Sequence, residues 1–107
     1  MKTLTPASAC GKTWFVSRHC GAIEWVRRQG LAVDRWIAHL DPAEVRPGDT
    51  VIGALPVHLA AEVCWRGARY LHLRVAIPQE SRGRELTARD LTAAGCTLVA
   101  FHVEENR

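Results

Sequence analysis

The chain has 107 residues, of which 48% are hydrophobic and 23% charged, and its formal net charge at pH 7 is +3. This length and composition predict a single globular domain. The charge is too small to indicate binding to duplex nucleic acid through a broad basic face, and every apolar run is far shorter than the ~18 residues of a membrane-spanning helix.

The spacing of the cysteines and the composition of the N-terminal segment indicate the cellular compartment of the protein. The four cysteines, at positions 10, 20, 64 and 96, contain no pair with CxxC spacing. We therefore expect neither a zinc site nor a disulfide framework, and free thiols favour a reducing cytoplasm. The stretch "MKTLTPASACGK" lacks the long apolar core of a signal peptide. We predict a flexible N-terminal segment over residues 1–11, a single domain over 12–104 and a tail over 105–107.

The first predicted elements are a strand and a helix. Residues 12–17 have the apolar character of a buried strand, and residues 21–29 have helical periodicity that Gly30 ends. The apolar face of this helix comprises Ala22, Ile23 and Val26. A second strand over residues 33–40 follows, and then a loop that contains two prolines and a glycine.

A second strand–helix pair follows this loop. Residues 50–55 predict a strand, and Pro56 stands at a first helical position, where its missing N–H costs nothing. Gly67 ends the helix. Its apolar face is predicted from the spacing i, i+3, i+4, i+7 to comprise Val57, Ala60, Ala61 and Cys64.

The last part of the chain predicts strand, helix and strand. Residues 69–77 alternate in polarity, so one face of this strand is apolar, and the other carries Tyr70, His72 and Arg74. After a polar loop, Thr87 is expected to cap a third helix, with Asp90 completing a capping box. Residues 96–103 predict the final strand.

This order of elements predicts an α/β fold with three layers, α/β/α, and a mostly parallel five-stranded sheet with three helices. In such a sheet, ligands bind beyond the carboxyl ends of the strands. The functional prediction therefore depends on the residues that follow each strand.

The residues after the first strand form the best-defined candidate site. Ser17, Arg18 and His19 come directly before a helix that begins near Gly21. The start of a helix offers unpaired N–H groups and the positive end of its dipole, while Ser17 adds a donor and Arg18 a cationic fork. The loop thus predicts an anion-binding site. The alternative is that Ser17 merely caps the helix, Arg18 is solvated and His19 is a turn residue.

Two later segments add candidates. Pro56 and His58 follow the third strand, although a histidine in the first turn of an amphipathic helix is often only a surface residue. The loop after the fourth strand carries Arg82, Arg84 and Glu85, and it either closes over a phosphate or is a solvated linker. Arginine outnumbers lysine twelve to two. A GC-rich genome explains most of that bias, and phosphate recognition by guanidinium groups is the functional alternative.

The chemistry of these residues suits a phosphodiester. The sequence has no HExxH or GxSxG motif and no carboxylate pair with metal-ligand spacing, so we expect neither metal-dependent hydrolysis nor a cofactor. Serine, histidine and arginine can bind a phosphodiester, and they can also cleave RNA without a metal, because the 2′-hydroxyl of the substrate is the nucleophile. Histidine suits the proton transfers because its pKa lies near neutrality.

Four segments carry a resemblance to a known family: "FVSRHCGAIEW", "VDRWIAHLDP", "GDTVIGALPVHLAAEVCWRGARYLHL" and "RGRELTARDL". Together they resemble a small CRISPR-associated protein family found beside type III CRISPR systems, over about Trp14 to Glu104. The resemblance implies a stand-alone relative of the CRISPR-associated Rossmann fold, and hence a Rossmann-like domain. The positions that match the family pattern are Ser17, Arg18, His19, Gly21, His58, Arg84 and Glu85.

The resemblance also implies a function. Members act as ring nucleases, which bind cyclic oligoadenylate, usually cyclic tetra-adenylate, and linearise it without a metal, so that type III signalling is switched off. A two-fold symmetric ring predicts a homodimer. One alternative is a sponge or sensor that binds the ring without cutting it. Another is a regulatory subunit that docks on an effector complex through the strand face of Tyr70, His72 and Arg74.

Overall fold

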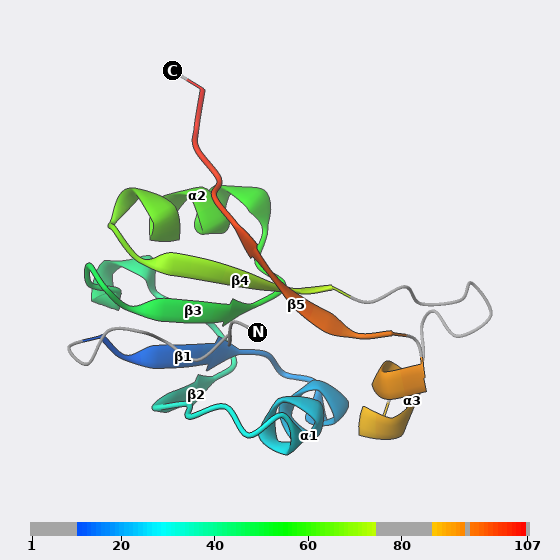
Figure 1. The fold of residues 1–107 in the computed structure, drawn as a ribbon. Coiled ribbons are helices and arrows are strands. Elements are labelled where there is room, and N and C mark those ends of the chain that lie inside the picture. The colour runs from blue at the N-terminus through cyan, green and yellow to red at the C-terminus, as the bar shows by residue number, and fades with distance from the viewer. Residues whose placement is uncertain (1–10, 75–86, 94, 107) are drawn as a thin grey trace.

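The structure is a computed structural model that describes residues 11–74, 87–93 and 95–106. Strands and helices alternate along these residues (Figure 1). In chain order the elements are β1 (Thr13–Val16), α1 (Cys20–Arg28), β2 (Arg35–Ile37), the 3-10 helix η1 (Pro42–Glu44), β3 (Thr50–Gly53), α2 (Val57–Trp65), β4 (Arg69–Arg74), α3 (Ala88–Ala93) and β5 (Thr97–Phe101).

The five strands form one sheet in the order β2-β1-β3-β4-β5. The pairs β1–β2, β1–β3 and β3–β4 are parallel, and β5 runs antiparallel to β4. This arrangement confirms the predicted α/β fold with a mostly parallel sheet and three helices. Because β2 lies on one side of β1 and β3 on the other, the strand order reverses between β1 and β3.

The helices cover both faces of the sheet, as the three-layer prediction requires. Alternate side chains of a strand point to opposite faces. On one face, Phe15, Ile52 and Leu71 belong to a core that α1 and α3 complete. On the other face, Trp14, Val51 and Tyr70 belong to a core that α2 completes. Figure 1 shows α2 on the opposite side of the sheet from α1 and α3.

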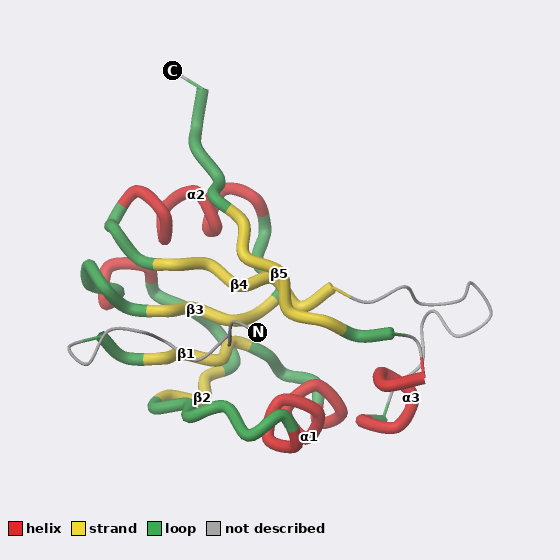
Figure 2. Tube along the Cα trace, viewed as in Figure 1, coloured by secondary structure: helices red, strands yellow, loops and turns green. Residues whose placement is uncertain are grey.

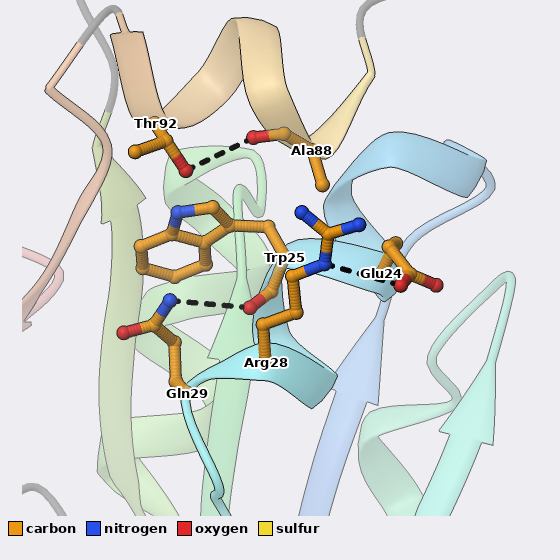
Figure 3. A network of polar contacts seen from close by, with 6 residues as sticks. All are labelled: Glu24, Trp25, Arg28, Gln29, Ala88 and Thr92. Carbon is orange, nitrogen blue, oxygen red and sulfur yellow. Dashed lines mark hydrogen bonds and ion pairs between the residues drawn. The ribbon is translucent and has the colours of Figure 1, made fainter.

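Helices α1 and α3 lie side by side. Figure 3 shows the indole of Trp25 between them, and this side chain is 6% exposed. The backbone carbonyl of Trp25 also accepts a hydrogen bond from the side-chain amide of Gln29 (3.3 Å). On the outer surface of α1, Arg28 pairs with Glu24 at 3.2 Å, and such exposed i, i+4 pairs add only a few tenths of a kcal/mol. This ion pair lies within α1, so the contact between the two helices depends on buried packing that includes Trp25.

The predicted capping box at the start of α3 is confirmed. The N–H of Asp90 donates to the hydroxyl of Thr87 (3.1 Å), and the N–H of Thr87 donates to the carboxylate of Asp90 (3.0 Å). The predicted second strand is shorter in the structure, Arg35–Ile37, because the chain turns away toward η1. There the carboxylate of Asp41 accepts the N–H of Ala43 at 3.1 Å.

The predicted apolar face of the second helix is partly wrong. Ala60 and Val63 are the buried residues of α2, whereas Val57 is 73% exposed. Val57 is the first residue of α2 and lies beyond the end of β3. The helical spacing places Val57 on the same stripe as Ala60, but the sheet below does not reach far enough to cover it.

A buried carboxylate joins the amino ends of β1 and β3. Asp49, which is 4% exposed, accepts hydrogen bonds from the N–H of Lys12 (2.8 Å), the N–H of Arg46 (3.0 Å) and Nε1 of Trp14 (3.1 Å). Burial alone would raise the pKa of Asp49, but these three donors outweigh it, so the pKa is lowered from 3.8. The sequence analysis did not identify this contact, because its partners lie up to 37 positions apart.

Gly53 ends β3 beside Val16, its register partner on β1. A Cβ at this position would meet the backbone oxygen of Val16 at 2.8 Å, which is shorter than real Cβ contacts. We expect Gly53→Ala to lower the free energy of unfolding by about 2 kcal/mol, because the two strands must separate to admit the methyl group. Urea denaturation followed by circular dichroism measures this loss. The exposed neighbour Ala54 supplies the control Ala54→Ser, and equal midpoints for both variants would contradict the expectation.

Candidate functional site

The predicted site begins at the edge of the sheet formed by the carboxyl ends of β1 and β3. Val16 and Gly53 are register partners at the ends of these parallel strands. From Val16 the chain passes to α1 on one face, and from Gly53 it passes to α2 on the other (Figure 1). In open α/β sheets, ligands bind in the crevice where the strand order reverses. Both predicted loops, after β1 and after β3, thus start at the expected place.

The loop after β1 is held by two hydrogen bonds from its own backbone. The N–H of Ser17 donates to the carbonyl of Ile37 (2.9 Å), and the hydroxyl of Ser17 accepts the N–H of His19 (3.1 Å). His19 is the N-cap residue of α1 and makes no side-chain cap hydrogen bond. Ser17 therefore stabilises the turn before the helix rather than capping the helix, and its hydroxyl hydrogen can still donate to a ligand.

The start of α1 has the features of an anion-binding site. Arg18 and His19 are exposed. The N–H of Ile23 makes the first i→i−4 bond of the helix, to the carbonyl of His19 (3.1 Å). The amides that precede it, from Cys20 to Ala22, lie in the first turn, where an α-helix has no internal partner for them. An anion near these amides would also meet the positive end of the helix dipole.

His58 lies at the same edge but on the other face of the sheet. It is the second residue of α2, and the Pro56 carbonyl before it accepts the N–H groups of Leu59 and Ala60, both at 3.0 Å. His58 lines an open hollow of about 1060 Å³ between α2 and the segment that follows β5. Figure 2 shows this segment running past α2.

The surroundings of His58 are acidic. Its hollow is also lined by Trp65, His102 and three glutamates, Glu62, Glu104 and Glu105. Glu62 is paired with Arg66 at 2.9 Å. No residue of the Ser17–Gly21 loop lines this hollow, as far as the described residues show. The structure therefore places the starts of α1 and α2 at one edge but gives the His58 side chain a different environment from Arg18 and His19. Arg82, Arg84 and Glu85 lie outside the described residues.

A second, smaller pocket was not predicted from the sequence. It has a volume of about 390 Å³ and lies between the start of α2 and the sheet. Six of its lining residues are Leu55, Val57, Tyr70, His72, Arg74 and Phe101. The alternation of β4 had placed Tyr70, His72 and Arg74 on one polar face, a candidate surface for docking. That interpretation is wrong for Tyr70, which is 3% exposed because α2 packs over it.

The Tyr70 hydroxyl connects three parts of this pocket. It accepts the N–H of Leu55 (2.9 Å), donates to the carbonyl of Gly53 (3.1 Å), and lies 2.7 Å from Nδ1 of His72. Burial raises the pKa of Tyr70, and this effect outweighs the opposing contribution of the Leu55 N–H. Tyr70 is therefore a neutral hydroxyl that fixes both the loop after β3 and the ring of His72.

Among the residues that the structure describes, no group of three or more histidine, cysteine or acidic side chains could hold a metal ion. Within the same ranges, no helix is long and apolar enough to cross a membrane.

The described cysteines differ in exposure, so their reaction rates test the packing around them. Cys20 is exposed at the start of α1, whereas Cys96 is buried, and burial raises the pKa of its thiol to about 11. We expect iodoacetamide at neutral pH to label Cys20 in the native protein and to label Cys96 only after unfolding. Peptide mass spectrometry of timed samples measures both reactions. Labelling of Cys96 as fast as Cys20 would contradict the packing described here.

Comparison with known proteins places this chain in a CRISPR-associated class. Residues 14–104 match the family model described as "Putative CRISPR-associated protein (Cas_VVA1548)". The chain belongs to this family, which confirms the small CRISPR-associated family indicated by its sequence motifs. Neither the curated proteins nor the solved structures contain a match to the chain.

Proposed function

We propose that this protein is a ring nuclease that binds cyclic oligoadenylate, most simply cyclic tetra-adenylate, and linearises it to switch off type III CRISPR signalling. The observation that carries the proposal is the Ser17–Gly21 loop. It brings an exposed arginine, an exposed histidine and the first turn of α1 to the edge where the strand order reverses. Membership of a CRISPR-associated family supports the proposal, because a ring nuclease of this kind would act within a CRISPR system.

The proposed reaction uses the ring's own 2′-hydroxyl. Arg18 and the amides at the start of α1 hold the phosphate and stabilise its charge in the transition state. Ser17 and His19 orient the attacking 2′-hydroxyl, whose proton His19 can accept. The 2′-oxygen bonds to phosphorus, the bond from phosphorus to the 5′-oxygen breaks, and His58 supplies the proton to that leaving oxygen. Within this proposal, Gly21, Pro56, Arg82, Arg84 and Glu85 contact the ligand.

The proposal includes a homodimer. A cyclic tetra-adenylate can be two-fold symmetric, and a domain of this size covers only half of such a ring. Two protomers that face each other across a two-fold axis would present the same loop to two equivalent phosphates. Analytical ultracentrifugation with and without the ring measures this assembly, and a monomer in both conditions would oppose it.

The reaction is tested by incubating the purified protein with cyclic tetra-adenylate and EDTA and separating the products by chromatography. Linear di-adenylate that ends in a 2′,3′-cyclic phosphate is the expected product. Intact rings after many hours with excess protein would reject the nuclease. If those rings are nevertheless bound tightly, the second candidate, a sponge or sensor that sequesters the messenger, replaces it.

His58 separates cleavage from binding. We expect His58→Ala to leave ring affinity unchanged and to slow cleavage by roughly 100-fold, the effect of losing a positioned proton donor. His102→Ala is the matched control, because His102 lines the same hollow and its side chain is also exposed. Single-turnover kinetics measure both variants. If His58→Ala cleaves at the wild-type rate, the proton donor is another group.

A further inference from the structure

The smaller pocket, between the start of α2 and the sheet, combines three features that suit the binding of a nucleotide. Leu55 and Val57 provide apolar walls, Phe101 provides an aromatic ring that is 45% exposed, and Arg74 provides a cation. The volume of about 390 Å³ is near the lower end of the range for small-molecule sites. The pocket also lies beside the carboxyl end of β4, the edge of a parallel sheet where ligands are expected.

One side of the pocket is fixed before any ligand arrives. The Tyr70 hydroxyl lies 3.1 Å from the Gly53 carbonyl and 2.7 Å from Nδ1 of His72, so Nδ1 is occupied by this contact in either tautomer of His72. This leaves Nε2 as the ring nitrogen available to a ligand. The His72 ring also packs edge-on against Phe101, with centroids 5.6 Å apart. Tyr70 and Phe101 thus hold the imidazole in one orientation.

Charge distinguishes this pocket from the larger hollow around His58. Three glutamates line the larger hollow, and one of them, Glu62, is paired with Arg66 at 2.9 Å. Among the described residues that line it, the smaller pocket contains Arg74 and no carboxylate. An aromatic surface beside a cation suits a ligand with a flat base and an anionic group, because bases stack on aromatic side chains and guanidinium groups bind phosphate.

We propose that this pocket binds one purine nucleotide unit, with the base against Phe101 and Val57, Nε2 of His72 as its hydrogen-bonding partner, and Arg74 at the phosphate. The choice of adenine as the base rests on the proposed function. The pocket would then hold a nucleotide of the ring that is next to the phosphate at the Ser17–Gly21 loop. Nucleotide-by-nucleotide recognition of this kind would discriminate the messenger from other cyclic nucleotides.

The probe is AMP, titrated into the ¹⁵N- and ¹³C-labelled full chain and followed by NMR. We expect saturable shifts at the imidazole of His72 and the ring of Phe101, weaker binding of adenosine, and no shifts from inorganic phosphate alone at the same concentration. The proposal is overturned if millimolar AMP leaves these resonances unchanged or shifts only the Ser17–Gly21 loop. If adenosine binds as tightly as AMP, Arg74 does not bind the phosphate as proposed.

Two variants keep the test independent of folding. Phe101→Ala is expected to weaken AMP about tenfold through loss of stacking. Val57→Asp should weaken AMP by a similar factor, because it places a negative charge at the pocket without disturbing buried packing, and an acidic residue in the first turn suits the dipole of α2. Trp65→Ser is the matched control, because Trp65 is as exposed as Val57, at 73%, but lines the other hollow. If Val57→Asp binds AMP with unchanged affinity, the proposal that this pocket binds a nucleotide is wrong.

The ring assay separates this inference from the proposed function. If the wild type cleaves cyclic tetra-adenylate and Val57→Asp does so with unchanged KM, the pocket is wrong and the nuclease stands. If AMP binds the pocket but the ring is neither cut nor bound, the nuclease is wrong and a nucleotide pocket remains.

Discussion

Replacing Arg18 with alanine is expected to lower the affinity for cyclic tetra-adenylate by at least about 100-fold. Arg18 is exposed directly before the first turn of α1. In the proposed complex its guanidinium pairs with a phosphate that also meets the unpaired amides of that turn. Charge-assisted hydrogen bonds of this kind contribute up to about 3 kcal/mol, and a two-fold complex loses one set in each protomer. Titration calorimetry with the 2′-deoxy ring, which cannot be cleaved, measures the loss.

Arg28→Ala is the matched control for this variant. Arg28 is also an exposed arginine of the α1 region, but it lies at the opposite end of the helix and is paired with Glu24 at 3.2 Å. We expect this variant to bind the ring like the wild type. Equal losses in the two variants would show that general positive charge attracts the ring. If the Arg18→Ala variant binds the ring as tightly as the wild type, the Ser17–Gly21 loop is not part of the binding site.

Replacing Asp49 with alanine is expected to give the largest loss of stability. The variant removes the acceptor of the partly buried N–H groups of Lys12 and Arg46 and of the buried indole N–H of Trp14. We expect the free energy of unfolding to fall by about 3 kcal/mol, which lowers Tm by about 15 °C in a domain of this size. Differential scanning calorimetry measures the change.

Asp34→Ala is the control for Asp49. Asp34 is exposed, and its carboxylate accepts one backbone hydrogen bond, from the N–H of Thr13 at 2.8 Å, so we expect a loss of only about 1 kcal/mol. If the two variants melt at the same temperature, the contact of Asp49 with its three donors does not hold the strands as described.

The contribution of Asp49 also depends on pH in a defined direction. Its pKa in the folded protein is lowered from 3.8, because the three donors outweigh the effect of burial. The stabilisation is therefore fully present above the unfolded pKa, near pH 4, and is lost as the pH falls through the folded value. We expect the stability difference between wild type and Asp49→Ala to narrow below pH 4, as urea titrations at a series of pH values would show. A difference that stays constant into acid would contradict the lowered pKa.

Local patterns in the sequence predicted most of the fold. Helix ends at Gly30 and Gly67 were identified correctly, and both glycines have positive φ values. The capping box at Thr87 and Asp90 also follows from residues only three positions apart. Such features depend on a few neighbouring residues, so the sequence alone can reveal them. The order of strands and helices then restricts the sheet to few arrangements.

Contacts between distant strands were not predictable in the same way. The alternation of β4 indicated a polar face for Tyr70 and His72, but α2 covers Tyr70 and its hydroxyl bonds to Gly53, seventeen positions earlier. The periodicity of α2 likewise placed Val57 in the core, although the sheet ends before reaching it. In both cases the outcome depends on the lengths of elements that pack together, and no local pattern records this.

The account depends most on the claim that the edge between β1 and β3 holds a phosphate of a cyclic ribonucleotide. Its most direct test is an NMR titration of the ¹⁵N-labelled protein with 2′-deoxy cyclic tetra-adenylate. We predict that the largest saturable shifts fall on the amides from Ser17 to Ala22. Shifts confined to the hollow between α2 and the C-terminal segment, or no shifts at all, would contradict the claim.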